Sequence, residues 1–227
     1  MKKLIALGLL VFITVSAYSE RMFNSDLEFG FVYGLGSANY DEANSIVQIN
    51  KVSASGPGFY IDATTEFNKY FGMFADLNLI FPTKTSIEAK INGVSVSVDD
   101  YLKVNFEMNE LIGFCGIIPV TDNFKLRLGG GLDIGLMISS METTVYRYNV
   151  SIKELDIMFG IGIKAMGVFM ITEKVGLNFG INGDFFFGGI ARTATNVTGR
   201  SETKSDSFSR NINFFRPQIG LTIHFPK

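Results

Sequence analysis

Apolar and polar residues alternate along residues 124–138. Apolar side chains occupy nearly every second position from Phe124 to Ile138, and Lys125, Arg127, Asp133 and glycines lie between them. A period of two indicates a β-strand with one apolar and one polar face. The apolar face would contact a protein core in a soluble sheet and lipid in a membrane barrel.

Seven further stretches show the same alternation, so the sequence predicts an all-β protein with eight strands. In the stretch 101–118, Leu102 and Val104 fall on the apolar face, and Lys103 falls on the polar face. Glu110 interrupts that apolar face, which predicts a bulge near residues 108–111. The seven stretches are residues 26–36, 58–68, 70–81, 101–118, 153–169, 175–187 and 213–225.

Short and long connections alternate between these stretches. The short turns are residues 68–69, 121–123 and 172–174, and the long polar segments are 37–57, 82–100, 139–151 and 188–211. This alternation places all short turns at one rim, as in outer-membrane barrels. Asn92-Gly93 predicts a hairpin within the second long segment. The Ser-, Thr-, Arg- and Asn-rich fourth segment is expected to be a mobile loop.

The N-terminus reads as an export signal. A basic start, Met1-Lys2-Lys3, precedes twelve apolar residues, and small residues at Ala17 and Ser19 predict cleavage before Glu20. Twelve residues span only about 18 Å as a helix, which is short of a bilayer core of about 30 Å. We therefore expect residues 1–19 to be a signal peptide and residues 20–227 to form the barrel domain.

Composition excludes several classes of function. The net charge of −2 offers no basic footprint for nucleic acid. With only Cys115 and His224, the chain cannot form an intramolecular disulfide or a metal site of the HExxH or paired CxxC kind. We expect no metal, no cofactor and no catalytic residue. Cys115 is interpreted as a small lumen residue, and His224 as a lumen hydrogen-bonding group.

Three features favour lipid as the partner of the apolar faces, against the alternative of a secreted soluble β-barrel. The polar faces carry glycines and charges of both signs, which suit a narrow barrel interior. The apolar stretches are about nine to eleven residues long, which is enough for a tilted strand to cross a membrane. Aromatic residues gather toward both ends of the strands, as in an aromatic girdle: Phe67, Phe71, Phe124 and Phe225 at the short-turn rim, and Tyr33, Phe59, Phe81, Phe185, Phe187 and Phe215 at the other.

The last strand carries a recognisable motif, Gln218-x-Gly220-x-x-Ile223-x-Phe225. It resembles the signal that the barrel assembly machinery reads in small eight-stranded outer-membrane proteins of the OmpA, OmpX and OmpW kind. The resemblance implies an antiparallel up-and-down transmembrane β-barrel in the bacterial outer membrane, with outer-membrane lipid and that machinery as partners. Two residues, Pro226 and Lys227, follow the aromatic position, which suggests a spirochaete lineage.

The charged residues of the polar faces form the only group that suggests chemistry. Charges confined to a narrow lumen must pair, because an unpaired buried charge is very costly. They form either a structural plug or a narrow gate whose pairs exchange to pass ions or small solutes. The residues are Glu28, Asp62, Glu66, Asp76, Glu107, Lys125, Arg127, Asp133, Lys164, Asp184 and Arg216.

Several functions remain open from the sequence, all of them non-enzymatic, because His224 is the only histidine and is expected near the short-turn rim. The first is a surface-exposed envelope protein, or a narrow pore or passive transporter of small solutes or small hydrophobic molecules. Phe74, Ile80 and Met137 are candidates for an apolar pocket in such a transporter. The alternative is a loop-mediated adhesin or ligand-binding protein with a plugged lumen. It would meet a host or envelope partner through residues 146–148 and 192–210.

Overall fold

The computed structural model describes residues 23–39, 47–91, 94–99, 102–145, 148–197 and 200–226. The predicted signal peptide, the Asn92-Gly93 turn and loop residues Tyr146 and Arg147 lie outside these ranges. Within them, no helix is long and apolar enough to span a membrane.

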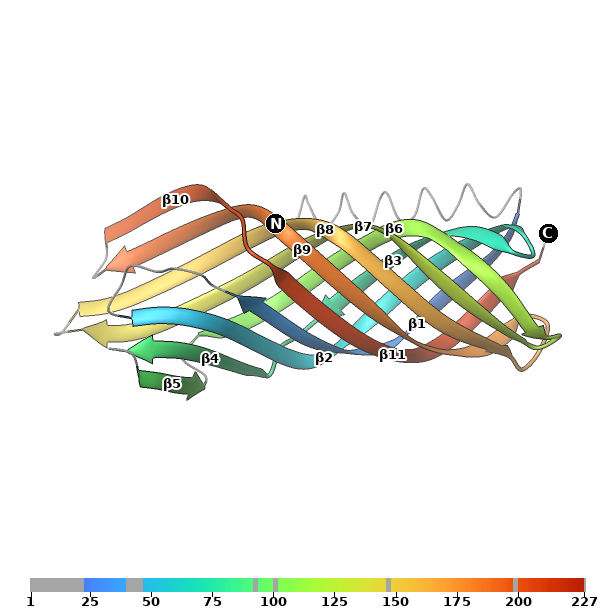
Figure 1. Cartoon of the computed structure of the whole chain (residues 1–227), viewed down its shortest axis with the longest axis horizontal. Coiled ribbons are helices and arrows are strands. Elements are labelled where there is room, and N and C mark those ends of the chain that lie inside the picture. Colours follow the sequence, from blue (N-terminus) through green and yellow to red (C-terminus); the bar gives the residue numbers. More distant parts are fainter. Residues whose placement is uncertain are drawn as a thin grey trace.

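Eight long antiparallel strands form a closed ring (Figure 1). The ring runs β1-β11-β9-β8-β7-β6-β3-β2 and closes because β1 pairs with both β11 and β2. This confirms the eight-stranded up-and-down barrel. The ring strands are β1 (Asn24–Asn39), β2 (Val47–Asn68), β3 (Phe71–Ile80), β6 (Lys103–Thr121), β7 (Phe124–Val145), β8 (Tyr148–Met170), β9 (Val175–Val197) and β11 (Ile212–Phe225).

Three additional strands occupy the long connections. The hairpin predicted in the second connection is confirmed as β4 (Lys84–Ile91) paired with β5 (Val94–Asp99). The mobile loop predicted for the fourth connection is wrong, because β9 continues to Val197 and pairs with β10 (Arg200–Phe208). Alternation of apolar and polar residues does not reveal such a hairpin, since backbone hydrogen bonds hold it together without an apolar face.

The bulge in β6 lies at a different position from the predicted one. Pairing between β3 and β6 is continuous from Phe71 opposite Gly116 to Ile80 opposite Glu107, and the register with β7 shifts only at residues 104–106 and 119–121. A register change at residues 108–111 would turn the apolar side chains of the rest of the strand toward the lumen. The strand instead keeps its register, and Glu110 lies on the outer face between Leu77 and Ile134. The shift at 104–106 also corrects the predicted faces. Val104 is buried inside the barrel, whereas Lys103 and Asn105 are exposed.

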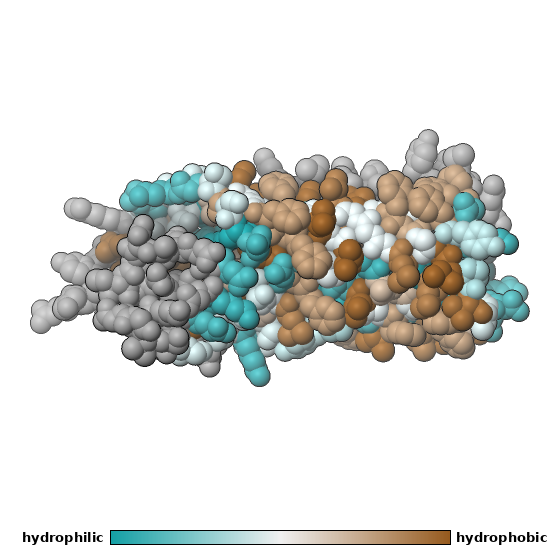
Figure 2. All heavy atoms as spheres, viewed as in Figure 1, coloured by the Kyte–Doolittle hydropathy of each residue, from teal (hydrophilic) through white to brown (hydrophobic). Residues whose placement is uncertain are grey.

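The outer face of the ring is apolar. Phe31 and Leu132 are 66% and 73% exposed, and large apolar side chains are exposed on all eight ring strands. Figure 2 shows them as a broad band, with hydrophilic residues beyond it toward the long-loop end. Phenylalanines lie at both predicted rims and also between them, as Phe31 does between Leu27 and Leu35. The exterior is therefore suited to contact hydrocarbon rather than water.

The interior of the ring is filled with side chains. Buried polar residues occupy most of its length, with apolar clusters between them. Cys115 is buried in one of these clusters, as predicted for a lumen residue. Three of these clusters are Val32, Tyr60, Ile80, Met166 and Val168; Ala38, Met158, Phe186, Ile212 and Phe214; and Phe74, Leu111, Cys115 and Ile117.

Candidate functional site

The inward charges form a ladder of ion pairs along the barrel axis. Its first tier lies near the short turns. Arg127 on β7 contacts Asp26 and Glu28 on β1, and its Nη2 lies 2.9 Å from Glu66 Oε1 on β2. Lys125 Nζ lies 2.7 Å from Asp26 Oδ2 and 2.5 Å from Glu66 Oε1. Two cations on β7 thus bind three carboxylates across the lumen.

Asp26 is the member of the first tier that sequence analysis missed. Besides the two cations, it contacts His224 on β11, with Oδ1 2.5 Å from Nδ1. His224 therefore hydrogen-bonds within the lumen, as predicted. The signal for Asp26 was available, because it lies two residues before Glu28 and hence on the same face of β1. It was overlooked because it begins the strand, where the alternation is least visible.

The second tier is centred on Lys164 of β8. Its Nζ lies 2.7 Å from Asp76 Oδ2 on β3 and also contacts Asp62 on β2. Asp76 accepts a further hydrogen bond from Asn182 Nδ2 at 3.0 Å, and Asp62 accepts one from Thr64 Oγ1 at 2.9 Å. Asn78 Nδ2 also donates to Asp76. One buried cation is therefore shared by two buried carboxylates, which accept from three neutral donors in all.

The third tier lies farther toward the long loops. Arg216 on β11 pairs with Asp184 on β9, with 2.5 Å between Nη1 and Oδ2, and both side chains are completely buried. The Arg216 guanidinium also lies 4.9 Å from the centre of the Phe214 ring. Glu107 and Asp133 are buried nearby, yet within the described part of the chain neither forms an ion pair. The other nine predicted lumen charges are all in ion pairs.

An apolar layer covers the ladder on its long-loop side. Met158, Phe186, Ile212 and Phe214 are buried together there. Beyond this layer lies a small cavity of about 60 Å³, which includes Met137. The predicted pocket of Phe74, Ile80 and Met137 is therefore wrong. The three side chains belong to three separate clusters, because the barrel is long and each lies at a different height.

A fourth set of charges, also missed, lies beside this cavity. Arg210, in the segment between β10 and β11, places Nη2 3.1 Å from Asp156 Oδ2 and 3.5 Å from Glu154 Oε1. Across the described ranges, no group of three or more His, Cys, Asp or Glu side chains is arranged to hold a metal ion. The arrangement as a whole is a set of fixed ion pairs that fills the lumen.

A closed ring of eight antiparallel strands, with a lipid-compatible exterior and a packed polar interior, defines a membrane-spanning β-barrel. Comparison with solved structures gives the same class. The chain is similar to the outer membrane protein OprG from Pseudomonas aeruginosa, at 12% identity and a TM-score of 0.54, over 90% of this chain and 97% of that one. It is also similar to a major outer membrane protein from Thermus thermophilus, at 9% identity and a TM-score of 0.50, over 88% and 99% of the two chains. The chain therefore has the fold of small outer-membrane β-barrel proteins. No protein-family model and no curated protein matches its sequence.

Proposed function

We propose that this chain is a non-enzymatic protein of the bacterial outer membrane whose lumen is closed to solutes and whose ligands bind at the long-loop end. The packing of the lumen supports the proposal. Three tiers of buried ion pairs cross the interior, and an apolar layer lies over them. Leaving one partner of a single buried pair without its counterion costs about 3–5 kcal/mol, so separating the pairs of all three tiers together is strongly unfavourable.

Conductance in planar bilayers tests the closed lumen. We expect the purified wild-type protein to give no discrete current steps, and Arg127→Ala, which removes the first-tier cation, to leave the record silent because the other tiers remain. Wild-type current steps that disappear in Arg127→Ala would instead identify the ladder as a gate. Heat-modifiable migration on gels should be checked for both proteins, so that silence is not caused by unfolded chains.

The long-loop end offers a surface for partners. The β7–β8, β9–β10 and β4–β5 ribbons extend beyond the apolar band (Figures 1 and 2). The β10 strand is polar and exposed nearly throughout. Rigid scaffolds commonly carry binding residues on such projections, which supports a host or envelope partner there.

A shortened β9–β10 hairpin tests this surface. The hairpin ends at the pair Val197–Arg200, and Arg192 lies opposite Ser205, so replacing residues 193–204 by Asn-Gly removes five pairs and closes the hairpin at Arg192–Ser205. The protein should still insert but lose binding to cultured host cells or to isolated envelope fractions. Undiminished binding by the shortened protein would rule out this hairpin as the contact surface.

One observation favours a second function, passive transfer of small hydrophobic molecules. The cavity above the apolar layer has a volume of about 60 Å³, and apolar side chains such as Val52, Met137 and Phe214 line it together with the carboxylates Glu107, Glu154 and Asp156. Just below it, the pairing of β1 with β11 is interrupted. Leu35 pairs with Phe215 and Val32 with Gln218, but the two positions between them on each strand are not paired. Pro217 lies in this gap and has no N–H to donate to the ladder. This interruption of the β1–β11 pairing supports a lateral path from the cavity into the membrane.

Uptake of a fluorescent apolar probe by proteoliposomes tests this second function. Ala54→Trp fills the cavity and should abolish uptake, whereas Ser205→Trp, on the exposed β10 strand, should leave it unchanged. Equal uptake by the wild type and Ala54→Trp would exclude the cavity as the route.

A further inference from the structure

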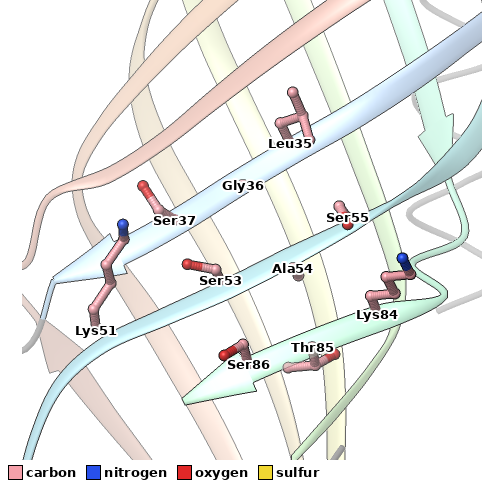
Figure 3. A pocket seen from close by; sticks show the side chains of 10 residues that line it. All are labelled: Leu35, Gly36, Ser37, Lys51, Ser53, Ala54, Ser55, Lys84, Thr85 and Ser86. Atoms are coloured by element: carbon pink, nitrogen blue, oxygen red, sulfur yellow. The ribbon is translucent and has the colours of Figure 1, made fainter. Parts of the chain in front are cut away.

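A polar trough lies on the outside of the barrel, just beyond the apolar band (Figure 3). It spans β1, β2 and β4 and has a volume of about 720 Å³. The strand register arranges its outward side chains in rows. Ser37, Ser53 and Ser86 form the central row. Three neighbouring serines leave a depression, because their side chains are short.

Two lysines bound the serine row. Lys84 lies one row closer to the membrane, beside Ser55, and Lys51 lies one row farther out. In Figure 3, Lys51 extends over the sheet toward β1. Neither lysine forms an ion pair with any residue that the structure describes, although Glu88 is the partner of Lys51 across the β2–β4 pair. Two free ammonium groups and three hydroxyls thus face one depression.

The junction between β3 and β4, beside the trough, is built by a close backbone approach. The β3 strand ends at Ile80, and β4 continues along β2 after a one-residue register change across Phe81-Pro82-Thr83. Phe81 N and Thr83 N donate to Pro57 O and Ser55 O at 2.9 and 2.8 Å. A Cβ on Gly56 would overlap the carbonyl oxygen of Phe81. Glycine at this position therefore allows the two strands to approach at the junction.

The trough lies at the level of lipid headgroups. The row directly below it holds Tyr33, Pro57 and Phe81, and both aromatic rings are exposed. Aromatic residues mark the interface between hydrocarbon and headgroups in membrane barrels. Successive rows are about 7 Å apart along a strand, or about 5 Å along the membrane normal at a tilt of 45°. The serine row is thus about 10 Å above the aromatic row.

An apolar groove continues the same face downward into the band. It has a volume of about 380 Å³ and lies on β1, β2 and β11. Phe31 and Phe59 border it, with ring centres 5.4 Å apart. The trough and the groove share β1 and β2 and are separated by the aromatic row. An amphiphile whose headgroup lies in the trough would therefore place an acyl chain along the groove.

We propose that this face binds a phosphorylated glycolipid of the outer leaflet. The lysines bind phosphate through charge-assisted hydrogen bonds, and the serine hydroxyls donate to and accept from sugar hydroxyls. The Cα atoms of Lys51 and Lys84 are about 14 Å apart by strand geometry. The serine row lies between them, so a headgroup that contacts both lysines also lies on the serine hydroxyls. The site is independent of the proposed roles of the lumen and the β9–β10 hairpin.

Lipid binding to the intact barrel in phosphatidylcholine nanodiscs tests the proposal, with monophosphoryl lipid A as the probe and native mass spectrometry as the readout. Lys51→Gln/Lys84→Gln should weaken binding about thirtyfold. The matched control is Lys103→Gln/Lys153→Gln. Lys103 on β6 and Lys153 on β8 lie on either side of Ser140 on β7. These strands lie across the barrel from the trough. The control should bind like the wild type.

Three results would overturn the proposal. Equal losses in the two double variants would indicate attraction by general surface charge. Equal binding of phosphatidylglycerol would remove the role of the sugar, and competition by millimolar inorganic phosphate would identify a free-ion site instead. Heat-modifiable migration of each variant confirms folding, and the conductance and hairpin experiments do not depend on the outcome.

Discussion

Replacing Lys164 with methionine should destabilise the barrel strongly. The Lys164 side chain is 5% exposed, and those of its partners Asp62 and Asp76 are fully buried. The change leaves two carboxylates without a cation in the lumen. Breaking one buried pair costs about 3–5 kcal/mol. Because both carboxylates keep a neutral donor, in Thr64 and Asn182, we expect a loss of about 4 kcal/mol in the free energy of unfolding.

Urea unfolding of the barrel in lipid vesicles measures this loss. Tyrosine fluorescence is the optical probe, since the chain has eight tyrosines and no tryptophan. With a denaturant slope of about 2 kcal/mol per molar, the midpoint should fall by about 2 M. Lys204→Met is the control. Its ion pair with Glu202 at 3.5 Å has side chains 70% and 71% exposed, and we expect a change below about 0.5 kcal/mol.

A compensated variant separates charge from packing. Asp62→Asn/Asp76→Asn/Lys164→Met removes all three charges, so most of the lost stability should return. The free energy of unfolding of Lys204→Met should lie close to the wild-type value. If that of Lys164→Met also lies within about 1 kcal/mol of the wild type, the second tier does not stabilise the barrel. The ladder would then be incidental to stability.

Three further predictions concern other parts of the barrel. Gly131→Ala should destabilise it by about 1–3 kcal/mol, because a Cβ there would overlap the carbonyl oxygen of Ile112; an unchanged urea midpoint would contradict this. Cys115, buried among Phe74, Leu111 and Ile117, should react with a maleimide reagent only after unfolding, and rapid labelling of the folded barrel would contradict its burial. Phe225→Ala should reduce the heat-modifiable fraction in cell membranes if the motif of the last strand directs assembly, whereas Tyr70→Ala, in a short turn, should not.

The barrel strands could be predicted because lipid outside and a narrow lumen inside impose alternation on every residue that crosses the membrane. The same constraint identified the inward charges from Glu28 to Arg216. It fails beyond the membrane, where the β9–β10 hairpin faces water on both sides and its polar strands resemble a loop. The alternation also predicted the β6 bulge at the wrong position, because Glu110, a charged residue on the outer face, was interpreted as a change of register.

The sequence by itself determined the class of fold, since the period of two along residues 124–138 and its seven counterparts admits only strands. It also determined which charges point away from the apolar face. Only the tertiary structure decided which charges meet. Arg127 binds Asp26 and Glu28 from across the lumen, about a hundred residues away in the chain. Such partners follow from ring closure and strand stagger, which fix the height of each residue in the barrel and are not encoded in any single strand.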